Sequence, residues 1–205
     1  MKERCILLQI KRNPWISTTD LFSSVVLVVL LLFVMAEIIP KFTQEAQRRD
    51  MMEKIETALT VYEQQGQVKV HTETGMLEFT SVTFDSGSAE LTPETKLLVK
   101  DLSENLIGYM AENPMLELLI EGHTDPAAIH AVINRGGYFE DNIQLSTLRA
   151  ANVRKELLAS MGKEYANRIG VAGYGDTRLK NTEQPVSPDN RRIEIRLLWK
   201  GQSAQ

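Results

Sequence analysis

Hydrophobic and polar positions divide the chain into three stretches with different periods. The first is an apolar run over residues 21–36, interrupted only by Ser23 and Ser24. Counted over residues 16–39, this stretch is longer than the roughly 20 helical residues needed to cross a hydrocarbon core. The pattern predicts a transmembrane helix over residues 15–39.

The second stretch, residues 40–66, is polar except for one narrow apolar stripe with steps of three or four, which is typical of a helix. The stripe comprises Phe42, Ala46, Met51, Met52, Ile55, Ala58, Leu59 and Tyr62. Such a stripe either packs on the helix's own domain or pairs with a second copy of the chain. We favour pairing in a homodimer, with packing on the chain's own domain as the alternative.

The third stretch, residues 67–200, predicts an α/β domain. Residues 68–82 alternate with period two around Thr74-Gly75, which indicates a hairpin. The order hairpin, helix, strand, helix, strand, strand then predicts an α/β sandwich with helices on one face of a mixed sheet. The elements after the hairpin are expected over residues 93–112, 115–121, 146–161, 169–173 and 193–199.

Asp20 lies at the start of the apolar run. An ionised carboxylate inside a bilayer costs roughly 2.5–3.5 kcal/mol even on lenient insertion scales, and a plain anchor does not need one. Acids within a membrane usually mark a proton or ion relay. Asp is also a common helix N-cap, a role that Thr18 or Thr19 could equally fill, so position alone leaves relay and cap open.

The residues before the apolar run carry four basic side chains against one acid, Glu3. This excess predicts a cytoplasmic tail over residues 1–14 and export of the C-terminal part. A secretory signal has a shorter apolar core of about 7–15 residues, so we favour an uncleaved anchor, with cleavage after residues 34–36 and secretion as the alternative. The only cysteine, Cys5, lies in the predicted tail, so the exported part has no disulfide.

Composition and motifs exclude several other classes. The net charge of −4 does not suggest a nucleic-acid surface. The sequence has no nucleophile elbow and no phosphate-binding glycine loop, so we expect neither an enzyme nor a cofactor. Glu121, His123, Asp125 and His130 could form a metal cluster, but two of them belong to a strand end, and we expect no metal.

Five blocks of the sequence match, in order, the signature blocks of the OmpA-like peptidoglycan-binding domain. They are residues 84–91 (FDSGSAEL), 121–125 (EGHTD), 142–150 (NIQLSTLRA), 173–176 (GYGD) and 190–195 (NRRIEI). Residues 15–21 (WISTTDL), before an apolar helix, resemble the MotB family of stator B subunits and the related B subunit of Zorya anti-phage systems. The resemblance covers about residues 15–39 and 68–199.

This resemblance implies a site for the diaminopimelate of peptidoglycan stem peptides, whose free end bears an ammonium and a carboxylate. Asp125 would take the ammonium, and Arg149 would clamp the carboxylate bidentately, as lysine could not. Asn142 would orient the loop or donate to the ligand, and Arg191 would add a contact. Residues 126–141 are longer than in typical members and either cover the pocket, contact another protein or form a surface elaboration.

The resemblance also implies an ion-driven rotary motor of the bacterial inner membrane. In it, a single-pass homodimer with a cytoplasmic N-terminus and a periplasmic domain stands inside a pentamer of MotA-like A subunits. Asp20 would be charged when facing water and neutral when facing the ring, with H⁺ as the default ion and Na⁺ as the alternative. Phage defence is the favoured process. A flagellar stator and a passive peptidoglycan-binding tether are the alternatives.

Overall fold

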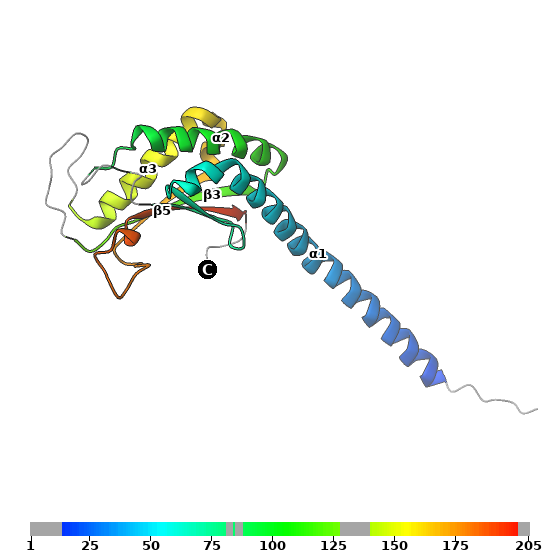
Figure 1. The fold of residues 1–205 in the computed structure, drawn as a ribbon. Coiled ribbons are helices and arrows are strands. Elements are labelled where there is room, and N and C mark those ends of the chain that lie inside the picture. Colours follow the sequence, from blue (N-terminus) through cyan, green and yellow to red (C-terminus); the bar gives the residue numbers. More distant parts are fainter. Residues whose placement is uncertain (1–13, 81–83, 85–87, 128–139, 201–205) are drawn as a thin grey trace, which may run out of the picture. The chain divides into compact units, whose positions relative to one another are not determined.

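The computed structural model describes residues 14–80, 84, 88–127 and 140–200, with side chains from residue 18 onward. The chain forms two compact units, Met1–Glu45 and Ala46–Gln205. Helix α1, Pro14–Gln64, begins in the first unit and ends in the second (Figure 1). Of the predicted cytoplasmic tail, residues 1–14, only Pro14 is described, as the first residue of α1. The short tail predicted over residues 201–205 lies outside the described residues.

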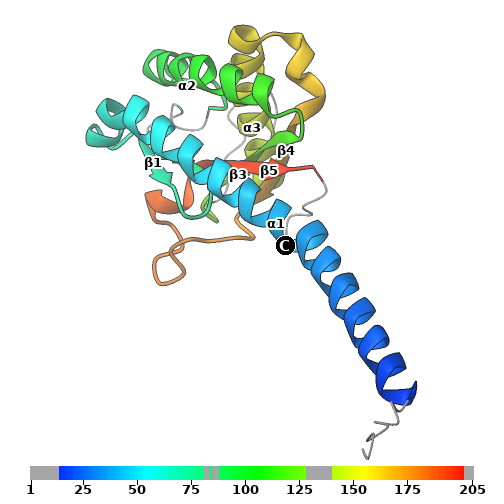
Figure 2. The ribbon, with the colours of Figure 1, turned by 90° about the vertical axis from the view of Figure 1, so that its right-hand side faces the viewer.

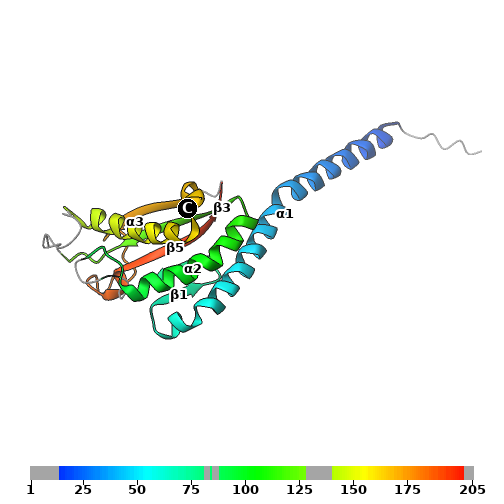
Figure 3. The same ribbon diagram turned by 90° about the horizontal axis from the view of Figure 1, so that it is seen from above.

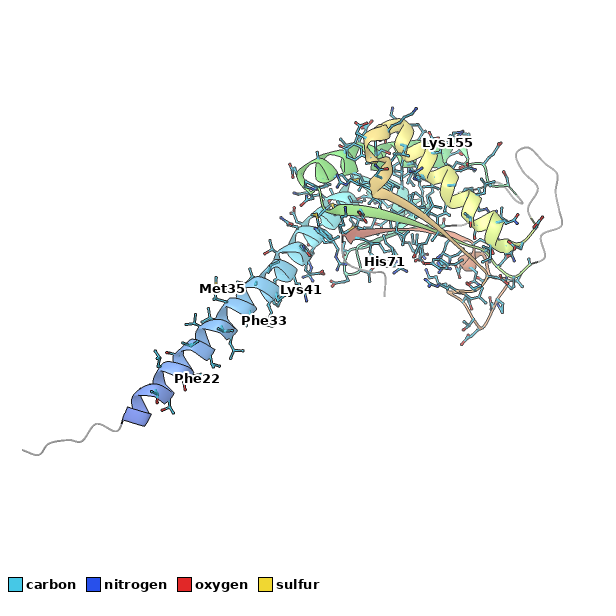
Figure 4. The ribbon with its side chains drawn as sticks, turned by 180° about the vertical axis from the view of Figure 1, so that it is seen from behind. Phe22, Phe33, Met35, Lys41, His71 and Lys155 are labelled. Atoms are coloured by element: carbon cyan, nitrogen blue, oxygen red, sulfur yellow. The ribbon has the colours of Figure 1, made fainter. Side chains whose placement is uncertain are left out.

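The first unit is the helical segment predicted from the apolar run. Large apolar side chains point outward all along it, as Phe22, Phe33 and Met35 illustrate in Figure 4, with exposed fractions of 75%, 61% and 52%. Among the described residues, α1 is the one helix that is long and apolar enough to cross a membrane by length and composition. The helix continues through Pro40, so the predicted connector extends the same helix.

The last turns of α1 belong to the core of the second unit. Met51, Met52, Ile55 and Leu59 are at most 2% exposed and pack in the hydrophobic core of that unit. Our preferred interpretation of this stripe, pairing with a second copy, is therefore wrong for these residues, and the alternative of packing on the chain's own domain is confirmed. Helical spacing reveals an apolar face but not the surface that covers it.

The sheet of the second unit is mixed, as predicted. Its strand order is β1-β2-β5-β3-β4, in which only β3 and β4 pair in parallel. The turn between the first two strands contains Gly75 at φ 68°, a left-handed conformation that glycine adopts without strain. The strands are β1 Val68–His71, β2 Met76–Phe79, β3 Leu116–His123, β4 Ile169–Gly175 and β5 Arg192–Trp199.

Helices α2, Pro93–Glu112, and α3, Asn142–Met161, lie on one face of this sheet (Figure 3). Thr92 caps α2, as its Thr-Pro start predicts. Asp141 caps α3, which begins four residues before the predicted Ser146. On the opposite side of the sheet from α2 lies the segment between β4 and β5, drawn in orange in Figure 2. Short 3-10 turns cover Lys163–Arg168 and Pro188–Asn190.

Candidate functional site

The first turns of α3 lie unusually close to the ends of β3 and β4, and glycines make this possible. A Cβ atom on Gly122 would lie 2.1 Å from the carbonyl oxygen of Ser146, and one on Gly173 would lie 2.0 Å from Oγ1 of Thr147. Ser146 fixes the contact, because its Oγ accepts a hydrogen bond of 2.9 Å from the backbone N–H of Gly175. The start of α3 and the end of β3 are thus held side by side.

Asp125 follows β3 and is only 6% exposed. Its Oδ2 accepts a hydrogen bond of 2.6 Å from Nη1 of Arg191, and its Oδ1 accepts one of 3.3 Å from the N–H of Ala127. Nδ2 of Asn142, the first residue of α3, donates to the Asp125 carbonyl at 3.2 Å. Asp125 therefore also caps its loop, and Asn142 orients that loop, as one of its two expected roles requires.

Arg149 projects from α3 and is only 7% exposed, so it is not a solvated surface arginine. Its Nε donates to the Ser88 carbonyl at 3.0 Å, and its Cζ lies 5.0 Å from the ring centroid of Phe84. Burial, and next the charge of Arg191, lower the pKa of Arg149 to about 10, while Asp125 opposes the shift. The guanidinium stays charged at neutral pH. Among the described residues, its Nη nitrogens have no hydrogen-bond partner, so they can bind an anion.

Arg191 reaches Asp125 from the segment before β5, and its side chain is 38% exposed. The neighbouring Asn190 is fully buried and holds this segment in place. Its Oδ1 accepts hydrogen bonds of 2.8 Å from the N–H groups of Lys180 and Asn181, and its Nδ2 donates to the Pro185 carbonyl at 2.7 Å. A rigid loop therefore presents Arg191 to the site.

The structure thus brings together all four residues predicted for the wall-binding site, Asp125, Asn142, Arg149 and Arg191. Together they carry one acid and two arginines. The sequence did not predict the Asp125–Arg191 ion pair or the contact of Arg149 with Ser88, because both join distant segments. Within the long insertion, residues 128–139 lie outside the described residues, and so does His130.

A second group of charges lies on β3 and β5. Atoms of Glu121, His123 and Glu194 that could bind a metal lie within 4.8 Å of one another, but Asp125 is not among them. Arg196 donates to both carboxylates, at 2.6 and 2.9 Å, and Arg192 donates to Glu194 at 2.7 Å. Because arginines already neutralise these carboxylates, the arrangement is that of an ion-pair network rather than of a metal centre.

His123 belongs to this network without bonding to it. Its ring stacks on Tyr174 at 5.4 Å between centroids, and neither ring nitrogen has a hydrogen-bond partner among the described residues. Burial, and then the positive charge of Arg192, lower the pKa of His123 to about 4, so the ring is neutral at physiological pH. His123 therefore acts as an apolar ring in this structure.

In the first unit, Asp20 lies well inside α1, which begins at Pro14. Helix boundaries are uncertain by only one or two residues, so Asp20 is not the N-cap of this helix. Thr18 and Thr19 are also internal, which removes the capping interpretation for them too. Asp20 is exposed on the helix surface, with hydroxyl residues on both sides of it in the sequence and the exposed apolar stretch beginning at Leu21. The relay interpretation of Asp20 remains a prediction.

Comparisons with known proteins agree with this fold. Motility protein B of Bacillus subtilis is 32% identical over 123 residues, which cover 59% of this chain and 43% of that protein. A putative truncated flagellar export/assembly protein, LafU, of Escherichia coli K12 is 32% identical over 120 residues, covering 58% of this chain and 51% of that protein. The chain thus spans about half the length of the curated relatives it matches.

Solved structures show the same architecture. A putative MotB-like protein from Desulfovibrio vulgaris superposes with a TM-score of 0.60 at 25% identity, over 76% of this chain and 96% of that one. The cell wall anchor of the T6SS from Pseudomonas aeruginosa shares the fold, with a TM-score of 0.55 at 23% identity. The superposition covers 71% of this chain and 96% of that one. The OmpA family model matches residues 83–192, more than half of the sequence, and the chain belongs to the OmpA family.

Proposed function

We propose that this chain is the wall-anchored B subunit of an ion-driven motor in the bacterial inner membrane. Its OmpA-family domain binds peptidoglycan in the periplasm, and its helix α1 carries an ion relay through the membrane. The chain acts as a homodimer within a pentamer of MotA-like subunits and is not an enzyme. The similarity to Motility protein B and to the MotB-like structure supports this assignment.

The observation that carries the wall-binding half is the pair of buried, opposite charges of Asp125, just after β3, and Arg149, on α3. Burying a charge is costly unless a partner compensates for it. An arginine at 7% exposure, whose Nη donors find no partner in the part of the chain that the structure describes, is therefore poised for an anionic ligand. Asp125 offers the matching acceptor for a cation. Diaminopimelate presents both charges on one carbon, and we propose that Asp125 binds its ammonium and Arg149 its carboxylate.

Co-sedimentation of the full-length protein with purified diaminopimelate-type peptidoglycan tests this half. Asp125→Ala and Arg149→Ala should each abolish co-sedimentation, because removing one partner leaves the other charge buried without compensation in the complex. Lys155→Ala, a change at an exposed residue further along α3, is the matched control and should sediment like the parent. Wall binding by both site variants at the parental level would refute the site.

The observation that carries the membrane half is Asp20, a carboxylate internal to a helix and directly before its exposed apolar stretch, which begins at Leu21. A passive tether, the second candidate function, has no need of this acid. We propose H⁺ as the transported ion. Hydroxyl groups near Asp20 leave Na⁺ as the alternative, although Ser24 donates its hydroxyl to the Leu21 carbonyl of its own helix.

The process that the motor powers is proposed to be phage defence, with flagellar motility as the alternative. The names of the relatives favour motility, since the curated matches are motility and flagellar proteins. Co-expression with a MotA-like A subunit in a non-motile, phage-sensitive host separates the two. Protection from phage supports defence, and restored swimming of a stator-deficient strain supports motility.

A further inference from the structure

In the free protein, Asp125 is already occupied. Nη1 of Arg191 donates to its Oδ2 at 2.6 Å, the distance of a strong charge-assisted hydrogen bond. A ligand ammonium would need the same carboxylate oxygen. Binding at this site therefore has to include the loss of an ion pair, and the cost of that loss depends on what Arg191 does next.

The two ends of this ion pair differ in freedom. Asp125 is 6% exposed and held by bonds from Ala127 and Asn142, so it cannot follow a departing partner. The Arg191 side chain is 38% exposed, although its backbone is anchored beside the buried Asn190. The guanidinium of Arg191 can therefore swing away while the carboxylate remains in place.

Charge decides where Arg191 can go. In the free protein, the single acid of the site lies between two arginines, and the charge of Arg191 is felt at Arg149. An ammonium that enters alone would leave three cations around one carboxylate. A ligand that also brings a carboxylate supplies the anion that the displaced Arg191 and Arg149 both need.

We propose, resting on the proposed wall-binding function, that Arg191 is a specificity residue that occupies the ammonium position of the empty site. The ligand ammonium replaces Arg191 on Asp125, and the freed guanidinium joins Arg149 on the ligand carboxylate. Ligands with an ammonium but no carboxylate are rejected, because they would displace Arg191 without giving it a new partner. This arrangement selects ligands that carry both charges.

Binding of three soluble stem tripeptides to the full-length protein in detergent tests this exchange. The first ends in diaminopimelate. In the second, the carboxylate at the free amino-acid end of the diaminopimelate is an amide, so this end keeps only the ammonium. In the third, the amine of the same end is acetylated, so this end keeps only the carboxylate. Arg191→Gln should bind the amide roughly fivefold more tightly than the parent does, because it removes a half-exposed competing ion pair. Arg178→Gln, at an exposed arginine stacked on Tyr174, is the charge-matched control and should leave all affinities unchanged.

The outcomes separate the two claims. The exchange also predicts that Arg191→Gln loses affinity for the N-acetyl peptide, which then meets an uncompensated Asp125. The exchange alone would be overturned if Arg191→Gln bound the amide no more tightly than the parent does, while the parent bound the diaminopimelate peptide normally. Failure of the parent to bind the diaminopimelate peptide would overturn the wall-binding function and the exchange with it.

Discussion

The two units of this chain use apolar residues in opposite ways. In the first, Phe22 is 75% exposed and Leu21 67% exposed, whereas in the second Phe79 and Leu77 are fully buried. One helix, α1, contributes to both patterns, because its last turns bury Met52 and its first turns expose Phe22. Apolar side chains are buried where the surroundings are water and can be exposed where the surroundings are hydrocarbon. The exposed apolar stretch of α1 is suited to a hydrocarbon environment.

Each unit also contains exceptions to its own pattern, and the proposed sites are among them. The apolar helix carries the acid Asp20 near its start, and the second unit buries the charges of Asp125 and Arg149 as well as the network around Glu194. Burying or desolvating a charge costs free energy that folding alone does not require. Such exceptions are therefore the first places to look for function.

The largest effect should come from Asp20→Asn in the membrane unit. The amide is close in size to the carboxylate and is less costly in a bilayer, so expression, insertion and assembly with the A-type partner should persist. Because an amide cannot exchange a proton, motor-dependent activity should vanish in the phage-protection or swimming assay. Asp20→Glu, which remains titratable, is the control and should retain part of the activity.

An active Asp20→Asn strain would show that the acid in the apolar helix is not needed for function. The apolar helix would then be an anchor with an incidental acid. The passive tether would replace the motor as the function of this chain, while the wall-binding half would stand.

A smaller effect is expected in the domain from Gly122→Ala. The new methyl group would meet the Ser146 carbonyl at 2.1 Å, so α3 must shift away from β3, at a cost of about 1–3 kcal/mol in the free energy of unfolding. Gly108→Ala in α2 meets no atom within 4 Å and should raise stability by about 0.5–1 kcal/mol. Urea titrations compare the two, and a Gly122→Ala domain as stable as the parent would show that this close approach is not needed.

The smallest effect concerns His123, whose pKa is lowered from 6.5 to about 4 in the fold. Below pH 6.5 the unfolded chain binds a proton that the folded domain does not, so His123 makes stability fall as the pH drops toward 4. His123→Phe keeps the ring against Tyr174 and should reduce this loss, by at most about 2 kcal/mol between about pH 6.5 and 5.

Urea titrations at several pH values, followed by Trp199 fluorescence in a Trp15→Phe background, measure this difference. Glu194, whose pKa is lowered by its arginine partners despite burial, adds a loss of stability at still lower pH in both proteins. Equal slopes for His123→Phe and the parent between about pH 6.5 and 5 would show that His123 is not held neutral by the fold.

Local patterns predicted most of the fold, since alternation located the hairpin and Thr92-Pro93 located the start of α2. They failed where the answer depended on a distant surface. The stripe around Ile55, for example, packs on its own domain. The start of α3 at Asn142 was missed for a local reason, because the cap formed by Asp141 was not recognised. The residues of the site could be named from sequence blocks, but their pairing could not.

The reason is sequence separation. Arg191 is 66 positions from Asp125, and Arg196 is 75 positions from Glu121, so no local pattern links them. The periodicities that predict helices and strands relate only residues that are close to one another along the chain. Only the register of β3 against β5 and the close approach of α3 determine which charges meet.

The central claim is that Asp125 and Arg149 recognise the two charges on one ligand end together. The most direct measurement compares the affinity of the parent protein for two stem tripeptides, one ending in diaminopimelate and one with lysine in its place. Lysine keeps the ammonium and lacks the carboxylate, so Arg149 loses its partner and binding should weaken by at least about tenfold. Equal affinity for the two peptides would contradict the claim.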